Sequence, residues 1–180
     1  RKAVWAERTT ALDGGASVGA YTLLAAAWAG PTGRVFAFEP ADASRAGLAR
    51  HLSLNGLSDR VTIRPEAVGD TCGSAAFIDE GTHGDNRLAA RGTEGARVVP
   101  SLTIDDFCSR MNLAPDVIKI DIEGAELAAL RGARRTIASR RGALALFVEL
   151  HPATWGSFGV TRPDIEEEVR GEPLRRSRVP

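Results

Sequence analysis

The chain has 180 residues, of which 43% are hydrophobic, and its 23 basic residues are balanced by 23 acidic ones. This length supports one sizeable hydrophobic core, so we expect residues 1–180 to form a single domain. The balanced charge argues against a broad surface for nucleic acid or anionic membrane, and no stretch approaches the about 20 apolar residues of a membrane span, so a small neutral or zwitterionic partner fits better.

Short apolar runs alternate along the chain with longer segments of helical character. The runs of strand length are 10–13, 34–39, 61–65, 117–121 and 144–150. Such alternation is typical of right-handed βαβ units, in which helices cover both faces of a parallel sheet. The predicted fold class is therefore α/β, with a doubly wound, mostly parallel sheet.

Two segments between these runs, 42–56 and 123–139, have helical character, whereas the interval 72–103 breaks the rhythm. In that interval "CGSAAFI" and "RVVPSLT" flank a long polar loop, which predicts a hairpin-like excursion with a mobile tip. We interpret the tip either as a solvent loop without function or as a cover over the substrate.

The stretch "LDGGASVGAYTLLAAAWAG" (12–30) predicts a strand, a ligand-binding glycine turn and a helix. A dinucleotide fingerprint G-x-G-x-x-G would fall on Gly14, Ala16 and Gly19. Ala16 then replaces the glycine that lets the backbone approach a pyrophosphate, which argues against a dinucleotide.

Asp13, Gly15 and Gly19 instead match the D-x-G-x-x-x-G turn of S-adenosylmethionine (SAM) binding. The methionine amino and carboxylate groups of SAM need an acidic residue and exposed backbone N–H groups. Glu39 lies 20 residues beyond Gly19, the spacing at which this kind of fold places a carboxylate for ribose hydroxyls. The alternative is a strand-end carboxylate that caps the next helix.

Every predicted strand ends on, or runs into, an acidic residue. These residues are Asp13, Glu39, Glu66, Asp121 and Glu149. Ligands of open α/β sheets bind at the carboxyl ends of the strands, and acidic residues are depleted within strands. The carboxyl rim of the sheet is therefore the candidate site.

Six segments that follow one another along the chain carry a family resemblance. They are "LDGGASVGAYTLLAA", "GRVFAFEP", "RVTIRPEAVGD", "SLTIDDF", "VIKIDIEGAELAALRGARRTI" and "LFVELHP". Together they resemble the FkbM-type SAM-dependent methyltransferase family, which has the class I methyltransferase fold, over roughly residues 10–165.

The resemblance implies O-methylation of a hydroxyl on a sugar, a polyketide or another secondary metabolite. It also implies a set of cofactor-binding residues: Asp13, Gly15 and Gly19 for the methionine end of SAM, Glu39 for the ribose, and Glu66, Ala67 and Val68 for the adenine. Ser17 stands where the family usually has Asn, and it keeps a hydroxyl that can hydrogen-bond to the ligand. Gly14 replaces a β-branched residue, and the chain ends before the usual hairpin of strands 6 and 7.

His151, just past the fifth predicted strand, is the first candidate for the base that removes the acceptor proton, because its pKa range suits the task. The alternative is a His that caps the strand. We place Asp121 near the methyl group as a second rim residue. Asp121, Glu123 and Glu149 could instead hold Mg²⁺, which is the minority hypothesis, since Glu123 and Glu126 also suit the positive N-terminal end of the helix that follows.

Lys119 lies in an apolar strand, where a structural ion pair is the preferred interpretation. Trp155 and Phe158 either wall the acceptor pocket or pack the last helix against the sheet. The rival functions are an NAD(P)-dependent oxidoreductase and a non-catalytic SAM- or nucleoside-binding module. Motifs of nucleic-acid methylation are not found, which makes a nucleic-acid acceptor a weaker hypothesis.

The two cysteines, Cys72 and Cys108, lack the spacing of a zinc site or a disulfide framework. With no visible signal peptide, this usage indicates a reducing compartment and predicts a cytoplasmic location. The chain begins at Arg1 without a Met and stops after "GEPLRRSRVP", where another strand would be expected. We therefore expect both ends to be truncated.

Overall fold

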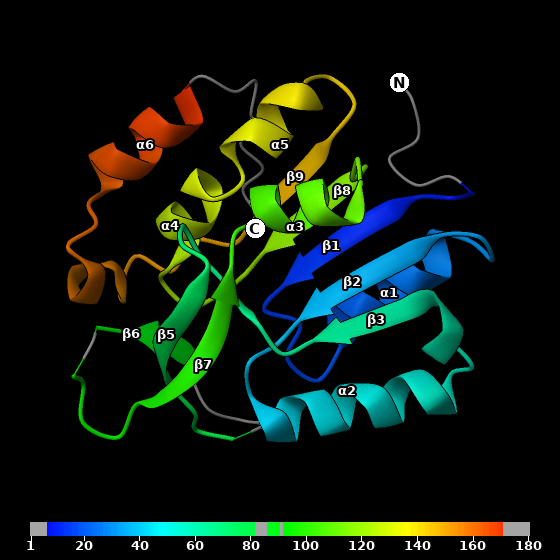
Figure 1. The fold of residues 1–180 in the computed structure, drawn as a ribbon, viewed down its shortest axis with the longest axis horizontal. Coiled ribbons are helices and arrows are strands. Elements are labelled where there is room, and N and C mark those ends of the chain that lie inside the picture. Colours follow the sequence, from blue (N-terminus) through cyan, green and yellow to red (C-terminus); the bar gives the residue numbers. More distant parts are fainter. Residues whose placement is uncertain (1–6, 82–85, 91, 171–180) are drawn as a thin grey trace.

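The computed structural model describes residues 7–81, 86–90 and 92–170. Its centre is a five-stranded, fully parallel sheet of order β3-β2-β1-β8-β9 (Figure 1). The strands are β1 (Thr10–Gly14), β2 (Arg34–Phe38), β3 (Val61–Arg64), β8 (Val117–Ile120) and β9 (Ala145–Val148). The predicted α/β class is confirmed, and the strand order reverses next to β1, where such folds bind ligands.

Helices cover both faces of this sheet (Figure 1). On one face lie α1 (Ala20–Trp28) and α2 (Asp42–Leu54), and on the other lie α3 (Ile104–Met111), α4 (Glu126–Arg131) and α5 (Arg134–Ser139). Side chains alternate along each strand, so Leu12 and Ile118 pack toward α3–α5 while Ala11 and Val117 pack toward α1 and α2. Burial of each large apolar side chain contributes about 1.5–3 kcal/mol to the stability of the fold. A shift of one residue would expose these side chains, so their burial fixes the register of the strands and with it the position of the rim residues.

The predicted excursion is a second, smaller sheet of order β4-β7-β5-β6. Its strands are β4 (Ala67–Val68), β5 (Gly73–Ile78), β6 (Arg87–Ala89) and β7 (Arg97–Leu102), and β5 pairs antiparallel with both β6 and β7. Phe77 and Val99 pack with Ala67 of β4 and against Ala41, which directly precedes α2. The tip predicted to be mobile includes 82–85 and 91, which lie outside the described residues.

The helical segment predicted as one unit over 123–139 is divided into α4 and α5. Gly132 makes the break: a Cβ there would lie 2.0 Å from the carbonyl oxygen of Gly69, so the backbone approaches the loop after β4. The Gly132 carbonyl also accepts a hydrogen bond from Asp105 N at 2.8 Å, at the start of α3. Close backbone contact therefore overrides the helical pattern.

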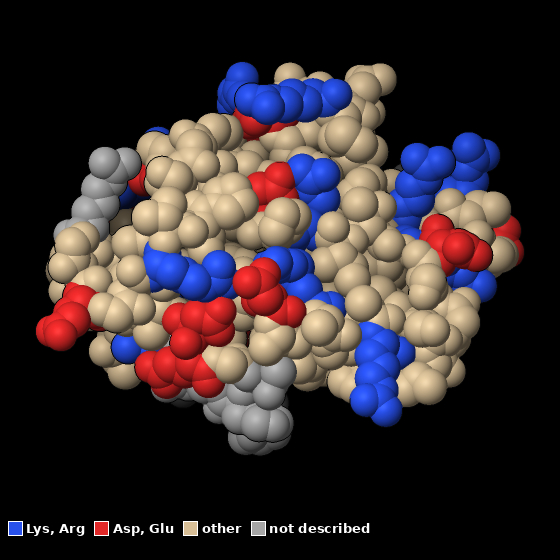
Figure 2. All heavy atoms as spheres, turned by 60° about the horizontal axis from the view of Figure 1, so that its bottom comes forward, with Lys and Arg blue, Asp and Glu red and all other residues tan. Residues whose placement is uncertain are grey.

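The remaining elements are short. A 3-10 turn η1 (Ser58–Arg60) precedes β3, and η2 (Trp155–Phe158) and α6 (Arg162–Arg170) follow β9. Over the described residues from 149 to 170, no strand extends the sheet beyond β9. On the face that carries α2, basic and acidic side chains are interspersed (Figure 2). None of the described helices is long and apolar enough to cross a membrane.

Candidate functional site

The glycine turn joins β1 to α1 and is folded tightly against β2 and β8. Gly15 has φ +78°, and a Cβ there would lie 1.7 Å from the Asp121 carbonyl oxygen. Gly19 has φ +101°, and a Cβ there would lie 2.4 Å from Leu48 Cδ1. Both positions require glycine for conformation and for space.

The N–H groups of this turn already have acceptors within the protein. Gly15 N and Ala16 N donate to the Phe38 carbonyl at 3.0 Å, Gly19 N donates to the Ala16 carbonyl, and Ser17 N donates to Glu39. The turn therefore uses these four N–H groups to hold its own shape.

Lys119 links the turn to the rim. Its Nζ lies 3.2 Å from both Asp13 Oδ1 and Asp121 Oδ2, and it donates to the Gly15 carbonyl at 3.3 Å. Burial alone would lower the pKa of Lys119, but the charges of the two carboxylates outweigh it and the pKa is raised. The predicted structural ion pair of Lys119 is confirmed.

Asp13 is 3% exposed and also accepts a hydrogen bond from Thr22 Oγ1 of α1 at 2.6 Å. Its other oxygen has no hydrogen bond of good geometry, with Lys119 as its nearest cation. Asp13 thus anchors β1 to α1 and to Lys119, behind the turn.

Glu39 lies at the end of β2 and is 4% exposed. Its Oε2 accepts from Ser17 N and its Oε1 from Ala41 N, both at 2.8 Å. Burial raises the pKa of the Glu39 carboxyl above its ordinary value, and the two N–H donors offset only part of that effect. Each carboxylate oxygen has a second lone pair, so Glu39 can still accept hydrogen bonds from a ligand.

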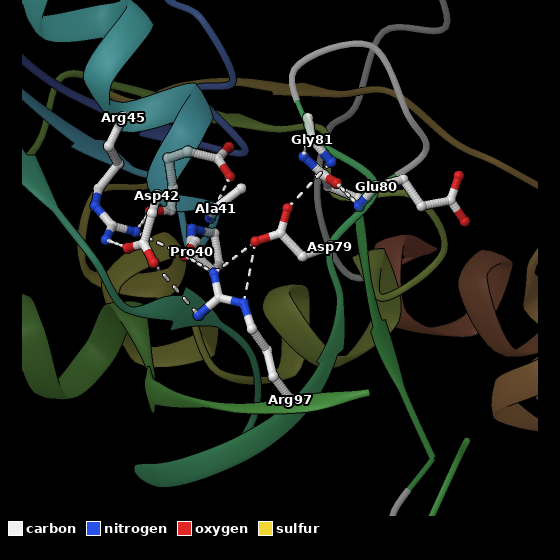
Figure 3. Close-up of polar contacts among 10 residues, drawn as sticks. Pro40, Ala41, Asp42, Arg45, Asp79, Glu80, Gly81 and Arg97 are labelled. Atoms are coloured by element: carbon white, nitrogen blue, oxygen red, sulfur yellow. Dashed lines mark hydrogen bonds and ion pairs between the residues drawn. The ribbon is translucent and has the colours of Figure 1, made fainter. Parts of the chain in front are cut away.

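An arginine network ties the loop after Glu39 to the second sheet (Figure 3). Arg97 of β7 pairs with Asp79 at 2.9 Å and donates to the Pro40 carbonyl at 2.7 Å. Arg45 of α2 donates to the same carbonyl at 2.7 Å and pairs with Asp42. Two guanidinium groups therefore meet at one carbonyl and hold the loop against both α2 and β7.

A cavity opens at the carboxyl ends of β1, β2 and β8, and we call it the rim cavity. It has a volume of about 120 Å³, and the predicted residues that line it are Gly15, Ser17, Glu39, Ala67, Val68 and Asp121. Phe38, Pro40, Ile122, Glu123, Phe77, Asn86, Arg87 and Leu88 complete its wall. Because usual small-molecule pockets hold about 300–1,000 Å³, we expect the β6 wall to move outward when a ligand enters.

Three of the predicted cofactor residues are not among those that line the rim cavity. Asp13 anchors β1 behind the turn, and Gly19 is a residue of the turn that faces Leu48. The Glu66 carboxylate forms an ion pair with the Arg64 guanidinium, two residues earlier along the chain.

Two non-glycine residues beside the rim cavity have left-handed backbone conformations. Ser17 has φ +47° and Glu123 has φ +54°. Such conformations cost free energy and are concentrated at functional sites. Ser17 is held by its bond to Glu39, and Glu123 precedes Gly124, whose φ of +106° continues the sharp turn after β8.

His151 follows β9 and is oriented by Glu126, the first residue of α4. Nδ1 of His151 lies 2.8 Å from Glu126 Oε1, and this carboxylate also accepts from Gly124 N at 2.7 Å and Trp155 Nε1 at 3.0 Å. Glu126 is fully buried. Because a carboxylate only accepts, the Nδ1 of His151 carries the proton and Nε2 faces the rim.

The predicted catalytic pair is brought together around Nε2 of His151. This nitrogen lies 3.6 Å from Asp121 Oδ1 and 3.5 Å from Glu123 Oε1. Burial lowers the pKa of His151, but the hydrogen bond to Glu126 and the neighbouring carboxylates outweigh it, so the pKa is raised. The sequence interpretation attributed Glu126 to the helix dipole and missed its contact with His151.

Asp121, Glu123 and His151 offer ligand atoms that all lie within 4.8 Å of one another. The sequence hypothesis of a Mg²⁺ site used Glu149 in place of His151, but Glu149 is 58% exposed and 4.0 Å from His151 Nε2. Mg²⁺ prefers an all-oxygen shell, so a set that contains a ring nitrogen does not fit it. The Mg²⁺ hypothesis is not supported.

Comparison with known proteins agrees with this geometry. Residues 13–170 match the Methyltransferase FkbM domain, so the chain belongs to the FkbM methyltransferase family. The family resemblance predicted from the sequence is confirmed. No curated protein matches the chain significantly.

Two solved structures have a similar fold. Methyltransferase FkbM from Methylobacillus flagellatus is 21% identical with a TM-score of 0.59, over 93% of this chain and 38% of that protein. A "putative rRNA-methylase" from Clostridium thermocellum is 16% identical with a TM-score of 0.56, over 92% of this chain and 72% of that protein. The chain thus spans well under half of the Methylobacillus protein.

Proposed function

We propose that the chain is a SAM-dependent O-methyltransferase that methylates a hydroxyl of a small metabolite or saccharide. The observation that carries the proposal is the charge of the rim cavity. Glu39 follows β2, and Asp121 and Glu123 follow β8 on the other side of β1; apolar Phe38, Val68 and Phe77 are also among the lining residues.

This combination of carboxylates and apolar side chains fits SAM, which combines a ribose, an apolar adenine, a sulfonium and an ammonium group. Glu39 would accept hydrogen bonds from the ribose hydroxyls, and Ala67 and Val68 would lie against the adenine. Asp121 and Glu123 would favour the cationic end, and Gly15 and Ser17 would lie beside it. Asp13 and Gly19 contribute by fixing the turn, and Glu66 has no direct role in this arrangement.

The same charges argue against a dinucleotide. A pyrophosphate would meet three carboxylates, and among the described residues that line the rim cavity only Arg87 is basic, at 3.5 Å from Glu80. Like charges in a partly desolvated site repel strongly. An NAD(P)-dependent oxidoreductase is therefore the weaker hypothesis.

SAM, when bound, supplies a methyl carbon whose bond to the sulfur breaks, leaving the electron pair on sulfur, as the acceptor oxygen bonds to that carbon. His151 accepts the hydroxyl proton at Nε2, because Nδ1 already carries a proton toward Glu126. Asp121 and Glu123 stabilise the imidazolium that results. This division of roles resembles other base and carboxylate pairs in catalysis.

Partner and location follow as further proposals. The interspersed charges on the face in Figure 2 favour a small acceptor over a nucleic acid, whose phosphates require basic contacts. We also retain the cytoplasmic location predicted from the sequence as a proposal.

Calorimetric titration with S-adenosylhomocysteine (SAH), SAM and NAD tests the proposed cofactor. We expect SAH and SAM to bind and NAD not to bind, and Glu39→Gln to weaken both SAH and SAM. Asp42→Asn, which changes an exposed carboxylate at the start of α2, is the matched control. Binding of NAD alone, or unchanged SAH affinity in Glu39→Gln, would contradict the proposal.

A further inference from the structure

A second cavity lies beside the rim cavity, between α4, the β5–β6 hairpin and η2, and we call it the α4 cavity. Its volume is about 330 Å³, which reaches the range of small-molecule sites. Of the fourteen described residues that line it, nine are apolar. A ligand in this cavity would therefore meet mainly hydrocarbon.

The polar residues of the α4 cavity stand at its mouth. Asp70, Thr71, Ser74 and Arg131 are all exposed, whereas Leu127 is buried and Ala128 and Phe158 are half-buried. A saccharide would bring several hydroxyls to the apolar floor, and each would lose water without gaining a hydrogen bond there. The distribution favours a ligand with an apolar body and its polar substituents at the mouth.

The two cavities adjoin each other along β6 and the turn after β8. Leu88 of β6 lines both, and Glu123 of the rim cavity is followed directly by Gly124 of the α4 cavity. Gly124 leaves room for the η2 segment: a Cβ there would lie 2.2 Å from Thr154 Oγ1 and 3.2 Å from Phe158 Cε2. His151 Nε2 lies 3.5 Å from Glu123, at this boundary.

We propose that the α4 cavity binds the methyl acceptor, and that the acceptor is a hydroxyl compound with a compact apolar body rather than a saccharide. This inference rests on the proposed methyltransferase function and narrows its substrate class. The reacting hydroxyl lies at the Glu123–Gly124 boundary, where its proton reaches His151 Nε2. Phe158 and Leu127 contact the apolar body, and Arg131 meets polar substituents at the mouth.

Fluorescence titration with 2-naphthol, in the presence of saturating SAH, tests this proposal. We expect saturable binding that is at least about tenfold weaker in Ala128→Trp, because the new side chain fills the cavity. Ala138→Trp, at an exposed position of α5, is the matched control and is expected to leave binding unchanged. Methyl α-D-glucopyranoside is expected to compete poorly.

A second variant and a second ligand, SAH, distinguish a failure of the proposed acceptor class from a failure of the proposed methyltransferase function. Phe158→Ala is expected to weaken 2-naphthol while SAH affinity stays within about twofold. Failure of 2-naphthol to bind, equal binding by Ala128→Trp, or effective competition by the glucoside would overturn the proposed acceptor class. Loss of SAH binding by the unaltered chain would instead overturn the proposed function, and 2-naphthol binding can still be measured without SAH.

Discussion

Both sheets contribute a wall to the rim cavity, and the two walls are held in different ways. The carboxyl ends of β1 and β8 are fixed by buried contacts, among them the ion pairs of Lys119 and the approach of Gly15 to Asp121. The second sheet is tied to the loop after Glu39 by Arg97, whose side chain is 37% exposed. Substitutions in the first wall should therefore reduce stability or SAH binding severely, and substitutions in the second wall should reduce SAH binding only in part.

The largest effect is expected at Gly15. In Gly15→Ala the new Cβ meets the Asp121 carbonyl and the residue keeps a left-handed φ, so we expect a loss of about 3 kcal/mol or more in the free energy of unfolding. Denaturant unfolding measures this loss, and calorimetry should show no SAH binding.

Gly14→Ala is the matched control one residue earlier. A Cβ there would lie 3.4 Å from the Lys119 carbonyl and 3.6 Å from Val68 Cγ2, which are ordinary contacts. We expect near-normal stability and SAH affinity. Equal damage in the two variants would show that the close approach at Gly15 is not what limits the turn.

The next effect concerns the base. We expect His151→Gln to reduce methyl transfer by about 10²–10⁴-fold with little change in SAH affinity, because general bases contribute that much. The rate is measured as SAH formation from SAM with 2-naphthol as the acceptor. An unchanged rate would exclude His151 as the base.

Glu126→Gln tests the raised pKa of His151. The base must be unprotonated, so activity should rise with pH through a pKa above the ordinary value for histidine. Removal of the Glu126 charge should lower that pKa and move the rise in activity to lower pH. An NMR titration of His151 measures the pKa directly, and Glu149→Gln, an exposed carboxylate 4.0 Å from Nε2, should have a smaller effect.

These expectations also show what the sequence could predict. Alternating apolar runs defined the parallel sheet, and its strand ends located Glu39 and Asp121, because strand direction alone brings them to one rim. Glu126 was not recognised, since its contact with His151 spans 25 residues and depends on how α4 docks beside β9. Gly132 was missed as a helix break because the backbone that it approaches lies 63 residues earlier.

A smaller effect on SAH binding is expected from a substitution in the second wall. Arg97→Gln removes the pair with Asp79 and the bond to the Pro40 carbonyl, and partly exposed ion pairs contribute about 0–1 kcal/mol. We therefore expect SAH to bind up to about fivefold more weakly. Arg110→Gln, which loses an exposed pair with Asp106 on α3, is the control. Complete loss of binding would mean that the two walls are equally rigid.

The smallest effect is expected at Glu66. The sequence resemblance assigned it to the adenine, whereas it pairs with Arg64 and is not among the residues lining the rim cavity. Glu66→Gln should leave SAH affinity within about twofold. A large loss of SAH affinity, measured by calorimetry, would instead support the adenine contact that the resemblance implied for Glu66.

A crystal structure with SAH bound would show directly whether the rim cavity is the SAM site. We expect the ribose hydroxyls within hydrogen-bond distance of Glu39, the adenine beside Ala67 and Val68, and the sulfur on the side of Asp121 and His151. The α4 cavity should remain open beside the sulfur. SAH in the reverse orientation, or in the α4 cavity, would contradict the proposed SAM site.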